Sequence, residues 1–319
     1  MTGIDLNRLR HGDRRTLAKA ITLVESKLDA HRDQAQTLLQ SVLGDTGKSL
    51  RIGISGSPGV GKSTFIETFG LHLIDAGSKV AVLAVDPSSP IAGGSILADK
   101  TRMEDLSRQQ DAFIRPSPSE GTLGGVAQKT RETMLLCEAA GYDVILVETV
   151  GVGQSEYEVA GMVDFFMVLM LPNAGDELQG IKKGIMELAD ALVINKADGD
   201  SVELAERTRH HFESAMLLLR HTEFWTPRVM TCSAQEKINL DAVWQMICDY
   251  RAAAIEDDSF DAKRTEQSRQ WMHKLLQEML ALKLSQNPDV GERLPLLEKK
   301  VVAGGTTPYA AAKEIIDLL

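Results

Sequence analysis

The sequence predicts an α/β fold built on a doubly wound, mostly parallel sheet, with helical N- and C-terminal extensions. Between residues 48 and 256, short β-rich apolar runs alternate with helical stretches, the pattern of strands joined by helices in a parallel sheet. Several runs, such as Val144–Val147, are continuously apolar, as expected for strands covered on both faces. We therefore expect a helical extension over residues 1–47, a sheet domain over 48–256 and a helical arm over 257–319.

The first extension is predicted to be helical over residues 13–43, before Gly44 and Gly47 interrupt the pattern. Its apolar side chains recur with the spacing of one helical stripe, at Leu17, Ile21, Val24 and Leu28. Strands are expected at Arg51–Ser55, Lys79–Asp86, Tyr142–Val150, Asp164–Leu171, Ala191–Asn195 and Arg228–Thr231. Helices are expected at residues 62–76, 126–140, 176–190, 201–220 and 239–254. The strand pattern stops after residue 255, and residues 260–319 are predicted to be all helical because a second stripe appears at Trp271, Leu275, Met279 and Leu282.

The composition is that of an ordinary soluble globular protein, with 319 residues of which 43% are hydrophobic and 25% charged. The 35 basic and 45 acidic side chains give a net charge of −10, which argues against binding to nucleic acid or to an anionic membrane. No apolar run reaches the roughly 20 residues of a membrane helix, and we see no secretory signal. The three cysteines form neither a disulfide framework nor a metal pair, so we expect a reducing, cytoplasmic location.

The strongest motif is a full match to the phosphate-binding pattern GxxxxGK[ST]. It consists of Gly56, Ser57, Pro58, Gly59, Val60, Gly61, Lys62, Ser63 and Thr64. Its glycines let backbone N–H groups converge on phosphate oxygens, and the helix that follows favours an anion at its N-terminus. Lys62 is expected to reach the β- and γ-phosphates, and the Ser63 hydroxyl is expected to bind Mg²⁺.

A second motif, Asn195-Lys196-Ala197-Asp198, follows a predicted strand directly. The Asp198 carboxylate can accept two hydrogen bonds from the ring N–H and the exocyclic amine of guanine, a donor pair that adenine lacks. Asn195 would tie neighbouring loops to the base, and the stem of Lys196 could lie over its face. Ser233 and Ala234 follow the next strand and could offer a backbone N–H to guanine.

Acidic residues after the second and third predicted strands are candidates for binding the metal ion. Asp86 and Glu148 end these strands, beside the phosphate loop, and Asp99 lies in a glycine-rich segment. Mg²⁺ needs only one or two protein carboxylates in addition to phosphate and water. The candidate metal ligands are therefore Ser63, Asp86, Asp99 and Glu148.

The position that often holds a water-orienting glutamine in small GTPases, directly after Gly151, is occupied by Val152. Gln154 is the first glutamine beyond it. We take Lys62, Glu148 and Gln154 as the candidate catalytic residues and expect slow intrinsic hydrolysis that a partner or a conformational change accelerates. Arginine fingers could come from Arg102, Arg108 or Arg115. The loop over 172–184 is either a nucleotide-sensing switch or a surface connection.

Taken together, these motifs resemble the MeaB/ArgK family of P-loop GTPases, which accompany adenosylcobalamin-dependent methylmalonyl-CoA mutase. The segments that carry the resemblance are Gly56–Thr64, Val85–Pro90, Gly93–Met103, Glu148–Glu156 and Asn195–Asp198. The glutamate at 148 departs from the usual aspartate of GTPases but agrees with this family.

This resemblance implies a GTP- and GDP-binding chaperone that uses Mg²⁺, gates adenosylcobalamin delivery to methylmalonyl-CoA mutase or a related acyl-CoA mutase, and protects the cofactor. It also implies a homodimer formed through the C-terminal arm, although the stripe from Trp271 to Leu282 would equally suit packing within one chain. Two alternatives stay open: a kinase that moves the γ-phosphoryl group to a small molecule or a transport protein, and a metallochaperone of the hydrogenase or urease type. The latter usually needs histidine or cysteine clusters, which we do not find in the sequence.

Overall fold

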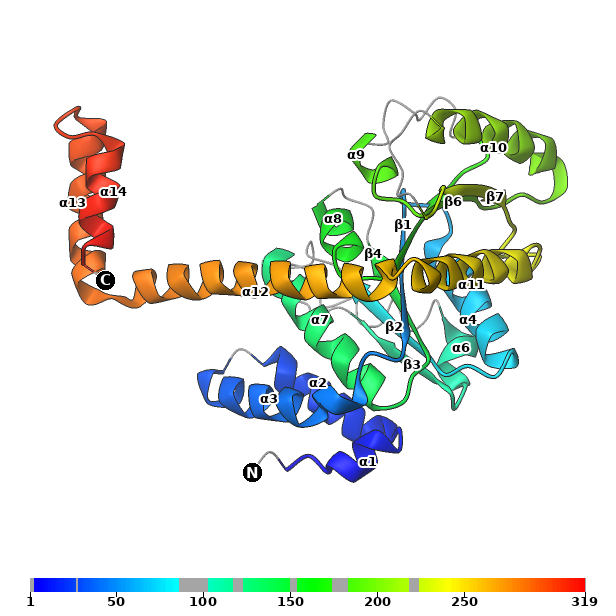
Figure 1. Ribbon diagram of the computed structural model, residues 1–319, viewed down its shortest axis with the longest axis horizontal. Coiled ribbons are helices and arrows are strands. Elements are labelled where there is room, and N and C mark those ends of the chain that lie inside the picture. Colours follow the sequence, from blue (N-terminus) through cyan, green and yellow to red (C-terminus); the bar gives the residue numbers. More distant parts are fainter. Residues whose placement is uncertain are drawn as a thin grey trace. The chain divides into compact units, whose positions relative to one another are not determined.

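The computed structural model describes residues 3–26, 28–85, 103–116, 123–149, 154–173, 183–217 and 224–318. The chain divides into two compact units, the first ending at Asp261 and the second beginning at Ala262. The sheet lies in the first unit, together with the N-terminal helices (Figure 1). The domain boundaries expected at residues 47 and 256 stay predictions.

The first unit is built on a parallel sheet, as the sequence predicts. Within the described residues the strands are β1 (Leu50–Gly56), β2 (Val80–Val85), β3 (Ala112–Arg115), β4 (Val144–Thr149), β5 (Phe165–Met170), β6 (Ala191–Ile194) and β7 (Arg228–Thr231). Their order across the seven-stranded sheet is β3-β2-β4-β1-β5-β6-β7, and every pair is parallel. The central strands are buried along almost their whole length, which explains their continuous apolar sequences.

Helices cover both faces of this sheet, so the fold is doubly wound (Figure 1). One core cluster joins a face of the sheet to α4 (Lys62–Asp75), α6 (Glu104–Arg108) and α11 (Leu240–Glu256). The other joins the opposite face to α7 (Leu123–Ala139), α8 (Gln154–Ala160), α9 (Lys183–Met186) and α10 (Val202–Met216). A short 3₁₀ helix, η3 (Gly199–Ser201), precedes α10.

The N-terminal helices extend the second of these core clusters. They are α1 (Leu6–Arg10), α2 (Arg14–Glu25) and α3 (Asp29–Val42), followed by the 3₁₀ helix η1 (Leu43–Asp45). Both α2 and α3 pack against α7. A buried ion pair ties this region to the sheet, because Glu138 of α7 accepts hydrogen bonds from the Arg51 side chain at 2.7 Å and from the Gly47 amide at 2.6 Å.

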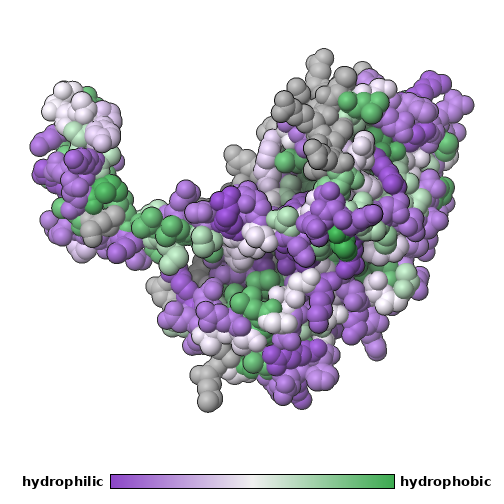
Figure 2. Space-filling view, viewed as in Figure 1, coloured by the Kyte–Doolittle hydropathy of each residue, from purple (hydrophilic) through white to green (hydrophobic). Residues whose placement is uncertain are grey.

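The second unit is helical, as expected, and contains most of α12 (Ser259–Gln286) together with α13 (Pro288–Val302) and α14 (Pro308–Ile316). A small core of Val290, Leu297, Ala311 and Ile315 joins α13 to α14. Further apolar side chains of this unit stay exposed and colour its surface green in Figure 2. In the part of the chain that is described, no helix combines the length and the apolarity needed to cross a bilayer.

Two local expectations are wrong, and one strand was missed. The helix predicted over 13–43 is interrupted, because α2 ends at Glu25 and α3 begins at Asp29. Between them the Ser26 hydroxyl accepts a hydrogen bond from the Leu28 amide at 3.3 Å. The helix predicted to end at residue 190 ends at Met186, and its beginning at 176 lies outside the described residues. Strand β3 was not predicted, because only four residues form it at the edge of the sheet.

Candidate functional site at the carboxyl edge of the sheet

The predicted phosphate loop follows β1, the central strand. Because β1 lies between β4 and β5, it marks the point where connections leave toward opposite sides, the usual place for a ligand in an open α/β sheet. Gly56 has φ +150°, and a Cβ there would lie 2.6 Å from the Leu169 carbonyl oxygen. Gly61 has φ +94° directly before α4 begins at Lys62. The loop therefore has the tight backbone path that its glycines predict.

Lys62 lies folded into the loop, with 9% of its surface exposed. Its ammonium group donates to the carbonyl oxygens of Gly56 at 2.7 Å and Ser57 at 3.2 Å. Burial lowers the pKa of Lys62, and the negative charges of Glu148 and Glu156 oppose that shift. The loop thus contains one buried cation whose charged form is favoured by two carboxylates.

Ser63 and Glu148, two of the predicted metal ligands, lie together. The Ser63 hydroxyl donates to a Glu148 carboxylate oxygen at 3.3 Å, although the two residues belong to different elements, α4 and β4. Hydroxyl and carboxylate oxygens are the hard ligands that Mg²⁺ takes, and two protein ligands suffice when phosphate and water complete the shell. The pair therefore fits a magnesium ion. Within the described ranges, no three His, Cys, Asp or Glu side chains converge in a metal-binding cluster.

Asn195 connects the phosphate loop to the two loops that follow β6 and β7. Its side-chain amide donates to the Val60 carbonyl oxygen at 2.9 Å, and its side-chain oxygen accepts from the Ala234 amide at 3.1 Å. It is 2% exposed, so these bonds form in a buried setting where an unpaired amide would be costly. Three predicted motifs, far apart in the sequence, thus meet at one side chain.

Lys196 and Asp198 continue this arrangement on either side of Ala197. Lys196 adopts φ +60°, and its ammonium donates to the Gly59 carbonyl oxygen at 2.8 Å. The Asp198 carboxylate accepts from the Ser233 hydroxyl. The Ser233 and Ala234 amides donate to Ile238 and Asn195, respectively, so both backbone donors that the sequence suggested for guanine have partners within the chain.

Several candidates cannot be placed. Asp86, Asp99, Arg102 and Val152 lie outside the described residues, as do positions 174–182 of the predicted switch loop and the side chain of Gln154. The other two candidate arginine fingers form ion pairs, Arg108 with Glu104 and Arg115 with Glu25. Neither of those acids is a predicted site residue.

Sequence reasoning missed a buried polar layer beside the phosphate loop, consisting of Ser55, Thr149, Ser155 and Glu156. All four are at most 2% exposed, and the Thr149 hydroxyl donates to Ser55 at 3.0 Å. The sequence pattern that could have revealed this layer is the three-residue spacing between Glu156 and Val159. In a helix this spacing places the Glu156 carboxylate on the same core-facing side of α8 as Val159. That signal was lost because no helix was predicted there.

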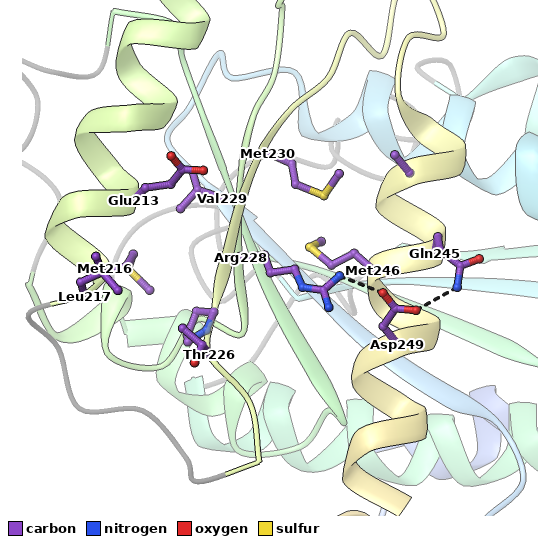
Figure 3. A pocket seen from close by; sticks show the side chains of 12 residues that line it. Glu213, Met216, Leu217, Thr226, Arg228, Val229, Met230, Gln245, Met246 and Asp249 are labelled. Atoms are coloured by element: carbon purple, nitrogen blue, oxygen red, sulfur yellow. Dashed lines mark hydrogen bonds and ion pairs between the residues drawn. The ribbon is translucent and has the colours of Figure 1, made fainter.

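A cavity of about 720 Å³ lies elsewhere, between α10, the edge strand β7 and α11 (Figure 3). Methionine side chains of all three elements line it, and Arg228 of β7 points toward α11, where it pairs with Asp249 at 2.8 Å. None of the predicted site residues lines this cavity. We therefore base the functional argument on the loops at the carboxyl edge of the sheet, where the chemistry-bearing residues meet.

Comparison with known proteins identifies the family. A family model described as "Methylmalonyl Co-A mutase-associated GTPase MeaB" matches residues 17–289. The protein named GTPase ArgK from Escherichia coli (strain K12) is 54% identical over 285 residues, which cover 89% of this chain and 86% of that protein. The mitochondrial methylmalonic aciduria type A homolog of Mus musculus is 48% identical over 312 residues, which cover 94% of this chain and 75% of that protein. A crystal structure titled "LAO/AO transport system kinase" matches with a TM-score of 0.79 and 44% identity, over 98% of this chain and 95% of that one.

Proposed function

This chain belongs to the MeaB family of methylmalonyl-CoA mutase-associated GTPases, and from that premise we propose that its GTP-bound state gates adenosylcobalamin delivery to a mutase and protects the cofactor there. The mutase is methylmalonyl-CoA mutase or a related adenosylcobalamin-dependent acyl-CoA mutase. The chain itself is a GTPase, which hydrolyses GTP to GDP and phosphate. The family description and the name of the mouse relative support the mutase as the partner.

The observation that supports the guanine-nucleotide site best is the pair of hydrogen bonds made by Asn195. One holds the Asn195–Asp198 segment against the phosphate loop at Val60, and the other holds it against Ala234 after β7. A ligand bound to the loop at its phosphate end can therefore reach Asp198 at its base. In this arrangement the loop amides and Lys62 bind the phosphates. The carboxylate of Asp198, oriented by the Ser233 hydroxyl, accepts the two donors of guanine.

Ser63 and Glu148 would hold Mg²⁺, with Asp86 and Asp99 as further proposed ligands. Bound there, the ion would neutralise charge on the β- and γ-phosphates. The residues of the chain orient the triphosphate: the ammonium of Lys62 leaves the carbonyl oxygens of Gly56 and Ser57 and binds phosphate oxygens instead. Glu148 and Gln154 are the groups proposed to orient the attacking water. Because position 152 is a valine, we expect slow hydrolysis without the partner.

Calorimetry in the presence of magnesium tests the nucleotide site. We expect the chain to bind GTP and GDP and to bind ATP at least about 100-fold more weakly, since two hydrogen bonds to a carboxylate are lost with adenine. Replacing Lys62 by Ala should remove most of the affinity. Equal affinity for GTP and ATP, or tight GTP binding by the Lys62→Ala variant, would contradict the proposed site.

A pull-down with a non-hydrolysable GTP analogue tests the partner. The bound protein, identified by mass spectrometry, should be an acyl-CoA mutase that contains cobalamin, and its recovery should fall when GDP replaces the analogue. The same preparation of Asp198→Asn, which should bind the analogue poorly, provides the control. Recovery that does not depend on the nucleotide would rule out gating by GTP.

A kinase activity is the second candidate, because the solved relative with 44% identity is titled a transport system kinase. A kinase would retain the γ-phosphoryl group on an acceptor, whereas a GTPase releases it to water. Following the labelled γ-phosphate during turnover separates the two activities. Label recovered entirely as inorganic phosphate excludes the kinase, and label on a small molecule or a protein supports it.

A further inference from the structure

Glu156 is a buried carboxylate to which the proposed nucleotide site assigns no role. It is 1% exposed, and within the described residues its one hydrogen bond comes from the Ser155 hydroxyl at 3.3 Å. A carboxylate removed from water is costly in free energy unless a cation compensates its charge. Its position therefore calls for an explanation other than stability alone.

The helix that carries Glu156 runs back from the carboxyl edge of the sheet. It begins five residues after Thr149 ends β4, and its last residue, Ala160, lies five residues before β5 starts. Its Val159 packs on Gly53 of β1, where an added Cβ would lie 3.0 Å from a Val159 methyl group. Glu156 lies on the same helix face one turn, or about 5 Å, closer to the carboxyl edge. It is thus level with Ser55, directly before the phosphate loop.

The positive charge of Lys62 lies close to this level, because its ammonium donates to the carbonyl oxygens of Gly56 and Ser57. The two charges attract each other, as do those of Lys62 and Glu148. We propose that Glu156 is a positioning residue, whose carboxylate holds the Lys62 ammonium inside the loop, competes with the nucleotide phosphates for it and thereby limits nucleotide affinity. This inference rests on the proposed placement of the phosphates beside Lys62.

The physical basis is repulsion between like charges in a region with little water. A bound nucleotide brings several negative charges next to a carboxylate that has almost no solvent to screen it. Binding must also separate Lys62 from its present partners. Both effects weaken binding, and they act more strongly on the triphosphate than on the diphosphate.

Nucleotide affinities of four proteins test the inference. Calorimetry with GDP and with a non-hydrolysable GTP analogue, in the presence of magnesium, compares the wild type with Glu156→Gln, Glu156→Asp and Glu203→Gln. Glutamine keeps the size of the side chain and its contact with Ser155 but removes the charge. We expect Glu156→Gln to bind both nucleotides more tightly, by about tenfold for the analogue and by less for GDP.

The other two variants separate charge from shape and from general electrostatics. Glu156→Asp restores the charge and should bind nucleotide as weakly as the wild type does. Glu203 lies on α10 with 87% of its side chain exposed, so Glu203→Gln removes one negative charge where solvent screens it and should leave both affinities unchanged. A purely structural role of Glu156 would not make binding tighter. Thermal melting of each variant verifies that it is folded.

Two results would overturn the inference: nucleotide affinity that is unchanged in Glu156→Gln, or affinity that falls. A fall accompanied by loss of hydrolysis would place Glu156 among the groups that orient the attacking water, which is a different role. Failure of the underlying site would look different. In that case the Lys62→Ala variant would bind nucleotide as the wild type does, whatever residue stands at position 156.

Discussion

Asp198 is the residue on which the choice of base depends in the proposed function. Its carboxylate is half-buried and is oriented by the hydroxyl of Ser233. Asparagine at this position has one acceptor and one donor in place of two acceptors. The side-chain N–H of asparagine would therefore face an N–H of guanine, and the two donors could not form a hydrogen bond. Xanthine has a carbonyl oxygen at the same position, which can accept from the asparagine N–H.

We expect Asp198→Asn to lower GTP affinity by at least about 100-fold, since each hydrogen bond to a charged group contributes about 1.5 to 3 kcal/mol. Affinity for xanthosine triphosphate should rise in the same variant. Calorimetry with both nucleotides measures the change. Asp200→Asn, two residues further along and exposed, is the matched control and should behave as the wild type. Unchanged selectivity for guanine would remove Asp198 from the base site.

Gly61 sets the distance between the phosphate loop and Asn195. A Cβ at this position would lie 2.9 Å from the Asn195 amide nitrogen, and the backbone has φ +94°. We expect Gly61→Ala to displace Asn195 from Val60 and to lower GTP affinity at least about tenfold, the cost of one buried hydrogen bond. Gly77→Ala provides the control, because Gly77 has a similar φ of +91° but no atom within 4 Å of an added Cβ. Equal loss of affinity in both variants would show that backbone strain alone is responsible.

These residues also indicate how far the sequence can predict a site. The spacing of the loop glycines predicts a backbone with positive φ angles, and Gly56 and Gly61 have such angles in the structure. The roles of Asn195 as a connector and of Glu156 as a buried charge depend on contacts between segments distant in the sequence. No local pattern encodes such contacts, so the connection from Asn195 to Val60 was expected only in general terms and Glu156 was missed.

At the scale of elements, the central strands were predictable because burial on both faces leaves them continuously apolar. The strand at Arg228–Thr231 was predicted with its observed bounds. Short elements such as β3 and α8 escaped prediction because few residues carry each periodic signal. The break between α2 and α3 was missed for a different reason. A serine that accepts a backbone hydrogen bond interrupts the helix there without any glycine or proline.

The contact between α7 and β1 depends on the ion pair of Glu138 with Arg51, whose side chains are 0% and 15% exposed. Removing one partner of a buried pair leaves the other charge uncompensated, which costs about 3 to 5 kcal/mol. We expect Glu138→Ala to lower the free energy of unfolding of the first unit by this amount, as measured by urea denaturation followed by circular dichroism. The ion pair of Arg10 with Asp45 is similar in length, at 2.8 Å, but its side chains are 41% and 37% exposed. Asp45→Ala should therefore cost at most about 1 kcal/mol, and equal losses would contradict a special role for burial.

At the scale of the whole molecule, the second unit differs from the first in how little of its apolar surface is buried. Its small core joins α13 to α14, whereas α12 exposes a row of large apolar side chains at Met272, Leu276, Met279 and Leu280. The spacing of four, seven and eight residues places them on one face of the helix. A continuous apolar row of this kind is typical of a helix that packs against a partner. Here the proposed partner is a second copy of the chain.

We expect the chain to sediment as a homodimer and Met279→Glu to shift it to the monomer, because a charge in the middle of the row would be buried in the interface. Met279 is 67% exposed, so the substitution should not unfold the isolated chain. Gln277→Glu adds the same charge to an exposed position outside the row and should leave the dimer intact. Analytical ultracentrifugation at several protein concentrations, with and without GTP, distinguishes these outcomes. A wild-type chain that stays monomeric, or a Met279→Glu variant that stays dimeric, would move the dimer interface away from α12. The nucleotide site would be unaffected, since it is built from residues of the first unit.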